Sequence, residues 1–458
     1  NCGTVTLGDS GDTFTIPAGA TITNSGTATG FGATGAVNWD VASIKTSTFT
    51  ATAGVGYFVN TTGGAVTVNL PAGSAGDVVG VSDYANNFAT AKCTIAPNGS
   101  EKMGGIADDA TLEIDGVAVT LVYVDGTKGW IVTDSGNQTD SPTASFITAT
   151  GGNQIDTCGN YKMHVFTAPG TFTVCTVGNS AGSNTVDYLV VAGGGSAGKS
   201  HTTPNGASGG GAGGFRLSNY YASPAPNMSP LASPTNITVS AQGYPIVVGG
   251  GGAGTPTGCN SNPGAKGNDS TFSTITSTGG GLGSGNQDHP EAPGNGGPGG
   301  SGGGGHQVTP GGNTTGVGNT PPVSPPQGNP GGGACSPSGN GGGGSGGVGG
   351  AANSPSTNDG GAGGIGSIVA KTEFAGCHGV AGPSPATRLF AGGGGGSNSP
   401  GRSPSGSQGS ATGGGGSAGS PGGTNGTDNT GGGGGSAVGA GGSGNGGSGI
   451  VIIKYKYQ

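Results

Sequence analysis

Runs of consecutive glycine constrain this chain more than any other feature of its sequence. Glycine accounts for 114 of the 458 residues, and 86 of these glycines follow residue 190, in runs such as 341–344 and 431–435. Glycine loses more conformational freedom on folding than any other residue and adds no side chain to a core. Such a segment is either disordered or held in an architecture of close backbone contacts, and the polyproline II helix, with three residues per turn, provides one.

Two apolar, β-prone segments favour an ordered structure. Residues 188–192 (Tyr-Leu-Val-Val-Ala) open the glycine-rich region, and residues 450–457 (Ile-Val-Ile-Ile-Lys-Tyr-Lys-Tyr) close it. A flexible linker has no need of strongly β-prone ends. We therefore predict that residues 192–458 form a bundle of polyglycine II helices closed by a C-terminal strand at 450–457, and that this strand pairs with residues 186–192.

The glycine runs also predict where side chains and loops lie in the bundle. Ten residues of polyproline II helix span roughly 31 Å, and inward-facing glycines let neighbouring backbones touch. Apolar residues that occur singly in the runs are expected on outer faces, and the Pro/Ser/Asn-rich connections at the ends of the bundle. These single residues are Leu282, Val348, Ile365 and Val438.

The residues before the glycine runs read as β-structure. We predict a short β segment at 1–35 that ends an upstream module, a β module at 36–138, and a β segment at 139–191 leading into the glycine-rich domain. Hairpins are indicated around Gly63-Gly64, around Asp125-Gly126 and around residues 168–170. No stretch has a helical period with caps. The predicted fold class is all-β N-terminal modules followed by a polyglycine II bundle, with essentially no α-helix.

Charge and cysteine content exclude several classes of protein. Residues 1–190 carry five basic and fifteen acidic side chains, and residues 191–458 carry eight and six, so no basic stripe for nucleic acid is present. No apolar run approaches the roughly 20 residues of a transmembrane helix. The chain begins Asn-Cys, as a processed protein or a fragment would. Its seven cysteines form no zinc motif; Cys158 and Cys175 are either bridged across a hairpin or remain thiols.

Sequence patterns associated with catalysis are weak. Residues 193–200 match the phosphate-binding pattern GxxxxGK[ST], but the following residues cannot form the helix that would hold phosphate. The five histidines lack the spacing of metal ligands or of a catalytic dyad. Acidic residues at 108–115 suit a solvated strand edge better than a cation site, and the β modules look too small for a sugar-cleaving groove. No enzymatic activity, metal or cofactor is expected.

Several glycine-rich motifs resemble the glycine-rich domain of tail-fibre proteins of tailed phages. The resemblance lies in residues 188–195, 209–216, 246–254, 270–280 and 446–455 and covers about residues 140–458. It implies a receptor-binding protein on the virion tail fibre, outside the cell, whose rigid polyglycine core displays loops. The implied partners are a bacterial surface glycan or outer-membrane protein and other tail-fibre proteins, and the implied assembly is a homotrimer.

The loops at 219–236, 306–330, 367–390 and 397–412 are the candidate receptor-binding segments, because rigid scaffolds commonly position recognition loops. Within them, Tyr220 and Tyr221 are suited to stack on a sugar ring or to anchor a loop. Hydrogen-bond formers are also expected there: His306, Gln307, Asn313, Arg388 and Arg402. A purely structural fibre protein without receptor contact is the alternative, and an ice-binding bundle lacks the required regular row of Thr or Ala.

Overall fold

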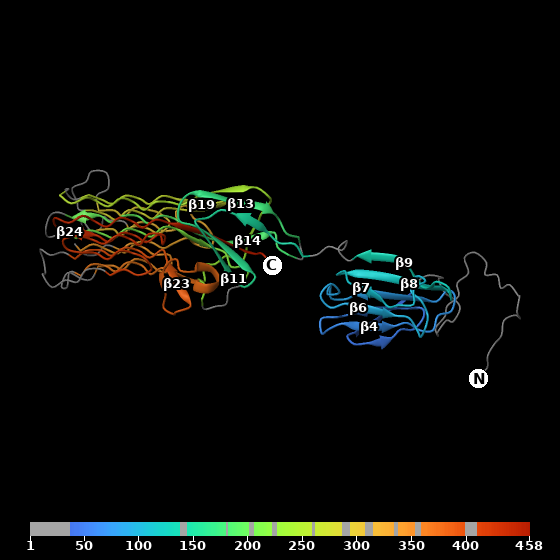
Figure 1. The fold of residues 1–458 in the computed structure, drawn as a ribbon. Helices are drawn as coiled ribbons and strands as arrows, with labels where there is room; N and C mark the ends of the chain where they lie inside the picture. Colours follow the sequence, from blue (N-terminus) through green and yellow to red (C-terminus); the bar gives the residue numbers. More distant parts are fainter. Residues whose placement is uncertain are drawn as a thin grey trace, which may run out of the picture. The chain divides into compact units, whose positions relative to one another are not determined.

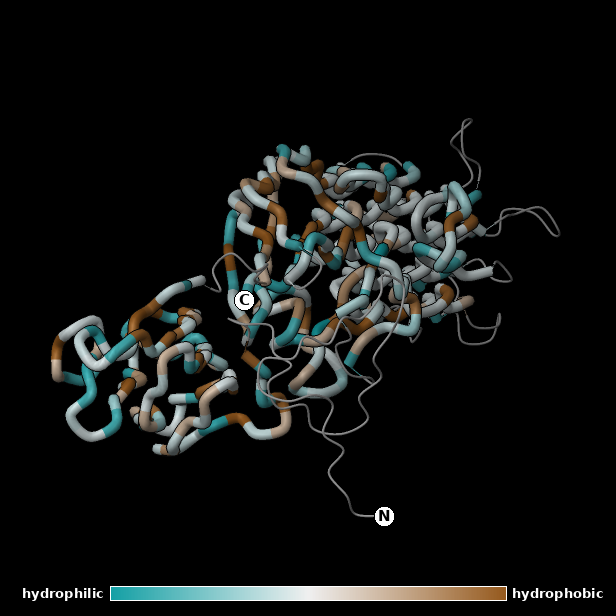
Figure 2. The backbone as a smooth tube through the Cα atoms, turned by 90° about the vertical axis from the view of Figure 1, so that its right-hand side faces the viewer, coloured by the Kyte–Doolittle hydropathy of each residue, from teal (hydrophilic) through white to brown (hydrophobic). Residues whose placement is uncertain are grey.

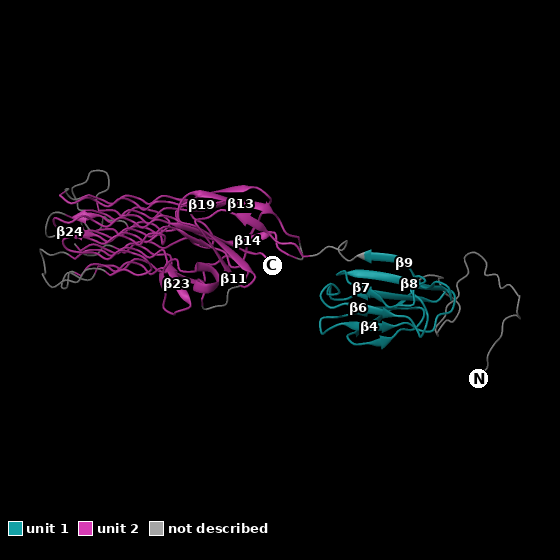
Figure 3. Cartoon of the chain, viewed as in Figure 1, with its two compact units in different colours: residues 1–143 teal, residues 144–458 magenta. Residues whose placement is uncertain are grey.

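The computed structural model divides the chain into two compact units, residues 1–143 (unit 1) and 144–458 (unit 2) (Figure 3). Residues 144–191, predicted as a segment leading into the glycine-rich domain, are part of unit 2, and the predicted β segment at 1–35 lies outside the described residues. The structure describes residues 37–137, 144–179, 182–200, 206–221, 227–258, 262–285, 294–306, 315–333, 338–352, 359–398 and 410–458.

Unit 1 is built from two sheets between which the chain alternates. One sheet has the order β1-β3-β5-β8-β9 and the other β2-β4-β6-β7. β1, β3 and β5 are parallel to one another, as are β2, β4 and β6, so successive passes of the chain stack as layers. The strands are β1 (Asn38–Lys45), β2 (Phe49–Thr50), β3 (Val55–Val59), β4 (Val66–Asn69), β5 (Val78–Asp83), β6 (Cys93–Ala96), β7 (Ala110–Leu112), β8 (Val117–Asp125) and β9 (Gly129–Asn137).

Of the two hairpins predicted in unit 1, one is confirmed and one is wrong. The hairpin around Asp125-Gly126 is confirmed, because β8 and β9 pair antiparallel. The hairpin around Gly63-Gly64 is wrong, because β3 and β4 lie in different sheets. Alternating apolar residues let both strands face the shared core, which contains Val59, Val68 and the fully buried Trp130. A local pattern cannot distinguish pairing within one sheet from packing across two sheets.

Unit 2 contains two sheets that pack face to face. One has the order β10-β13-β18-β19-β20, the other β11-β12-β25-β14-β16, with β17 paired to β14. Apolar and aromatic side chains from both sheets share one buried cluster that includes Phe172, Tyr244 and Ile453. The strands are β10 (Thr148–Thr150), β11 (Gln154–Cys158), β12 (Tyr161–Phe166), β13 (Gly170–Thr176), β14 (Thr185–Val191), β16 (Phe215–Leu217), β17 (Ile237–Thr238), β18 (Gly243–Val247), β19 (Ser270–Phe272), β20 (Ile275–Ser277) and β25 (Ile450–Lys456).

The predicted closure of the glycine-rich region is confirmed. β25 pairs antiparallel with β14, with Val191 opposite Ile450, and also with β12. The predicted hairpin at 168–170 is wrong as a pairing, because β12 and β13 belong to different sheets. Cys158 and Cys175 therefore do not face each other across a hairpin, and both are free thiols.

The glycine runs form the predicted bundle, and their backbone bonds repeat every three residues. Residues 193–199 donate N–H groups in turn to three neighbouring segments, at distances of 2.8–3.2 Å. A period of three is that of the polyproline II helix. Residues 193, 196 and 199 donate to 268, 265 and 262; residues 194 and 197 donate to 447 and 444; residues 195 and 198 donate to 211 and 208.

The carbonyl groups of the same segment accept bonds from three further neighbours. Those of residues 193, 194 and 195 accept from Gly280, Gly252 and Gly434, which gives this helix six neighbours. Such packing has no room for side chains on the inner faces: an added Cβ at Gly195 would lie 2.2 Å from the carbonyl oxygen of Gly281. Most of the bundle's backbone is near white in Figure 2, as glycine's intermediate hydropathy dictates.

Two of the four single apolar residues in the runs face outward, as predicted. Val348 and Ile365 are 62% and 58% exposed, and Leu282 is half-buried. Val438 is the exception, since it is 3% exposed and pairs with Ser200 where β15 (Lys199–Ser200) runs parallel to β24 (Ala437–Val438).

The bundle has two distinct ends (Figure 1). The strand end is where the runs meet β14, β16 and β25, and the β24 end carries β15 and β24. At the strand end, a small sheet, β21 (Ser367–Ala370), β23 (Thr387–Phe390) and β22 (Val380–Ala381), packs with the single-turn π-helix η2 (Lys371–Ala375) against the sheet of β25. None of the described residues belongs to a helix with the length and apolar character required to cross a membrane.

Candidate functional site

The predicted recognition segments do not share one end of the bundle. Described parts of 219–236 and 367–390 lie at the strand end, where Met228, Phe374 and Phe390 join one core cluster. Segment 367–390, predicted as a loop, is largely the small sheet with η2, because Val369, Phe374 and Phe390 bury apolar side chains there. In segment 306–330, Gly316 bonds to Gly303, so this part belongs to the bundle.

The β24 end is where described residues flank most of the long connections. Lys199 and Asn262 bridge there, the N–H of His306 donates to Gly294, and Ala207 accepts from Ser397. These residues adjoin the segments 201–205, 259–261, 286–293, 307–314 and 399–409, which lie outside the described residues.

A buried carboxylate fixes the backbone at Tyr220 and Tyr221. Asp187 on β14 is fully buried, and its Oδ1 accepts hydrogen bonds from Ser218 Oγ (2.8 Å) and from the N–H of Tyr220 (2.9 Å), while Oδ2 accepts from the N–H of Tyr221 (2.9 Å). Charge-assisted bonds of this kind are strong. The two tyrosines are therefore presented by a rigid turn.

The two tyrosines differ in role. The hydroxyl of Tyr221 bonds to Ser183 Oγ and to Thr185, and its ring lies 5.3 Å from that of Tyr161. Tyr221 is thus an anchor of the turn. Tyr220 is 57% exposed and contacts Tyr221 edge to face, with ring centroids 5.4 Å apart. Its ring face is accessible for stacking on a ligand.

Around these rings lies a surface hollow of about 490 Å³, which we call the tyrosine hollow. Burial, with smaller contributions from Tyr221 and Asp187, raises the pKa of Tyr161, and its protonated phenol can donate a hydrogen bond. Aromatic faces beside amide and hydroxyl groups match the surface of a sugar ring, which has apolar faces and a polar rim. The lining residues are Asn160, Tyr161, Asn179, Gly182, Ser183, Asn184, Thr185, Tyr220, Tyr221 and Lys456.

The other predicted contact residues within the described ranges do not line the tyrosine hollow. His306 is fully buried at the β24 end, so the prediction that it forms surface hydrogen bonds to a receptor is wrong, because a buried side chain cannot contact one. Arg388 is half-buried on β23. Gln307, Asn313 and Arg402 lie outside the described residues.

Sequence reasoning missed Tyr161, Lys456 and Asp187. These residues lie on β12, β25 and β14, and only the pairing of these three strands brings them beside residue 220. The pairing of β14 with β25 was predictable, but the position of Tyr161 depended on β12 joining the same sheet. No local motif marks any of the three.

Residues 193–200, which match the phosphate-binding pattern, do not begin a helix. They continue a bundle helix into β15, and the buried Lys199 donates from Nζ to the carbonyl of Pro256 (3.3 Å). In the acidic stretch, Glu113 pairs with Lys92 at 2.6 Å. Within the described ranges, no three His, Cys, Asp or Glu side chains are grouped as a metal site would require.

Comparison with known families agrees with this architecture. A model of the glycine-rich domain family matches residues 166–456, which is more than half of the chain. The chain belongs to this family, and the match begins at the end of β12 and finishes at the end of β25. A search of curated proteins found no match to the chain.

Proposed function

We propose that this protein is an adhesin of the phage tail-fibre type, which binds a glycan or outer-membrane protein on the bacterial surface through loops at the ends of its polyglycine bundle. The observation that supports this is the bonding of the runs: helices with up to six neighbours form a rigid scaffold that confines connections to the ends. A rigid scaffold lowers the entropy cost of binding. The virion tail fibre is the proposed location.

The tyrosine hollow is the best-built recognition surface among the described residues. It combines an exposed ring with a clamped backbone, and aromatic rings with few rotatable bonds contribute contact area at low entropy cost. We assign it a saccharide of the bacterial surface. The alternative is a fibre protein that contacts no receptor.

Adsorption to cells distinguishes these two functions. Labelled full-length protein is mixed with a panel of bacterial strains, and bound protein is measured after washing. We expect binding to at least one strain, and Tyr220→Ala should weaken it about fivefold or more, because loss of a ring that stacks on a ligand costs of the order of 1 kcal/mol. Ile114→Ala, which truncates an apolar side chain of unit 1 that is 59% exposed, is the control.

Two other results would change the proposal. Binding that survives Tyr220→Ala but is lost when residues 286–293 or 399–409 are replaced by a Gly-Ser link would move recognition to the β24 end and refute the tyrosine hollow. Absence of binding to every strain, with the protein folded, would favour the structural fibre.

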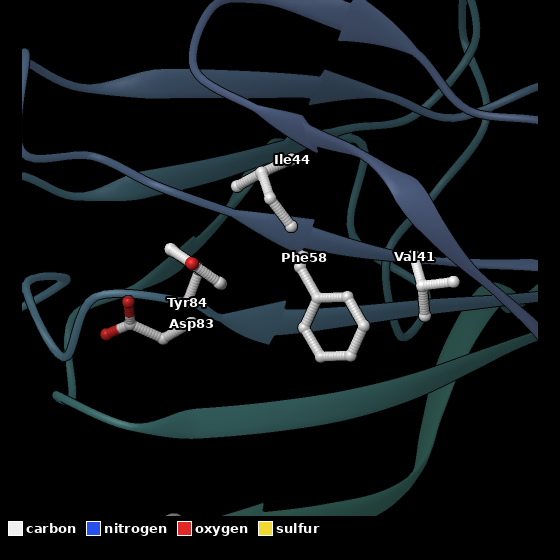
Figure 4. A pocket seen from close by; sticks show the side chains of 5 residues that line it. All are labelled: Val41, Ile44, Phe58, Asp83 and Tyr84. Atoms are coloured by element: carbon white, nitrogen blue, oxygen red, sulfur yellow. The ribbon is translucent and has the colours of Figure 1, made fainter.

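The second part of the proposal is a homotrimer assembled through unit 1. Supporting it, β1 is an edge strand, and its apolar residues Trp39 and Val41 are 36% and 77% exposed. The Trp39 ring lies over Gly56, where an added Cβ would come within 2.6 Å of it, and 5.0 Å from the ring of Phe58. Figure 4 shows Val41, Ile44 and Phe58 around a hollow that Asp83 and Tyr84 also line. Exposed apolar faces of this kind mark contact surfaces.

A further inference from the structure

A second hollow at the strand end has the composition of an anion site. It measures about 340 Å³ and lies between η2 and the turn that joins β22 to β23. Two cationic side chains line it, Lys371 and Arg388, and no acidic side chain does; the other lining residues are Ala381, Gly382, Pro383, Ser384, Pro385 and Thr387.

Neither cation forms an ion pair with another described residue. The ion pairs found in the described part of the chain, Lys45–Asp40 and Lys92–Glu113, both belong to unit 1. The Nε of Arg388 is buried and has no hydrogen-bond acceptor among the described residues. A buried donor without an acceptor is costly, and more so in a charged group. A bound oxyanion would give the Arg388 guanidinium an acceptor that the described residues do not supply.

The wall of this hollow is rigid. The turn is closed by bonds from the N–H of Thr387 to the carbonyl of Ser384 (3.1 Å) and from Thr387 Oγ1 to the same carbonyl (3.0 Å). The N–H of Lys371 donates to Ala386 (2.8 Å), which ties η2 to this turn. Both cations are thus carried by backbone that is already fixed, as a binding site requires.

We propose that the Lys371–Arg388 hollow binds the acidic group of a surface saccharide, a carboxylate, sulfate or phosphate. Arginine presents a planar fork that matches such oxyanions, and lysine adds a point charge. This inference rests on the proposed adhesin function and makes its ligand an acidic glycan whose acidic group is held here.

Titration calorimetry of the full chain tests this with three oligosaccharides of equal length: a uronate oligomer, a sulfated oligomer and a neutral glucose oligomer. Inorganic phosphate is a fourth probe. We expect at least one acidic probe to bind more tightly than the neutral oligomer and to weaken as salt is added. Which acidic probe binds identifies the group. Equal binding of neutral and acidic oligomers, or no binding of any probe, would overturn the inference.

Variants then locate the site. Arg388→Gln and Lys371→Gln should each weaken the acidic probe about tenfold, as expected for a lost charge-assisted bond, and Arg388→Lys should restore part of the affinity. Lys128→Gln, which removes one charge from an exposed side chain of unit 1, should leave it unchanged. If Arg388→Gln does not fold, the affinity of Lys371→Gln for the acidic probe and the salt dependence of binding test the anion site.

The experiments distinguish a wrong anion site from a wrong adhesin function. Unchanged affinity in the folded Lys371→Gln and Arg388→Gln variants would refute the anion site, while adsorption of the same variants to cells would leave the adhesin intact. Loss of cell adsorption together with loss of the acidic probe supports both.

Discussion

The buried glycines are needed because they have no side chain. At Gly210, a Cβ would lie 2.1 Å from the carbonyl oxygen of Gly195, in a helix that is surrounded on all sides by backbone. Gly250 is a different case, since the nearest atom to an added Cβ is Asn268 Nδ2 at 3.7 Å. Two glycines with the same composition around them therefore tolerate substitution very differently.

Gly210→Ala should destabilise unit 2 by about 3 kcal/mol, because neighbouring backbone must move and its hydrogen bonds weaken. Gly250→Ala should stay within about 0.5 kcal/mol of the parent, or stabilise slightly by restricting the unfolded chain. Chemical denaturation followed by circular dichroism measures both. Equal effects of the two substitutions would contradict the tight packing of the runs.

A buried histidine makes unit 2 sensitive to acid. His164 on β12 is fully buried, and its Nδ1–H donates to the carbonyl of Gly151 (2.6 Å), so its Nε2 accepts from the hydroxyl of Tyr455 (3.1 Å). Burial lowers the pKa of His164 and raises that of Tyr455 to about 12. The folded state holds the neutral ring, and protonation favours the unfolded state.

The melting temperature of unit 2 should therefore fall as the pH drops below about 6.5, where the unfolded histidine binds a proton and the folded one does not. The loss should level off below the lowered pKa of the folded state. His164→Gln should flatten this part of the pH profile. A slope that is unchanged in the variant would assign the acid sensitivity to other groups.

At the scale of elements, β25 is the central strand on which unit 2 depends. It lies between β12 and β14, and its residues contribute to both buried clusters, since Ile452 faces one and Ile453 the other. The whole bundle lies between β14 and β25 in the sequence, so this sheet is completed only after the chain has passed through the bundle.

Ile452→Ala should cost about 2–5 kcal/mol, the range for truncation of a fully buried aliphatic side chain. Val348→Ala, at a position 62% exposed in a glycine run, should change stability by less than about 0.5 kcal/mol. Thermal unfolding of the two variants provides the comparison. A small effect at Ile452 would mean that the bundle is stable without its closing strand.

At the scale of the whole molecule, the prediction concerns assembly. If the apolar face of unit 1 forms the trimer contact, Trp39→Ser should convert a trimer into monomers while leaving the buried Trp130 core folded, because Trp39 is 36% exposed and Trp130 is not exposed. Light scattering gives the mass of the assembly. A parent protein that is monomeric, or a variant that stays trimeric, would contradict this contact surface.

The sequence alone determined the class of architecture. Glycine-rich composition with flanking β-prone segments predicted the polyglycine II bundle, its three-residue repeat and the pairing of 186–192 with 450–457, because these depend on backbone sterics and local propensity. The same local signals located Tyr220 and Tyr221, but they could not separate an anchor from an exposed ring.

Tertiary structure alone decided which strands pair and which side chains meet. β3 and β4 lie in different sheets instead of forming a hairpin. The same alternating apolar pattern is compatible with either arrangement. The burial of His306 and the tyrosine hollow likewise depend on segments far apart in the chain. Contacts of this kind arise from the joint packing of many elements, whose free energy no single stretch of sequence encodes.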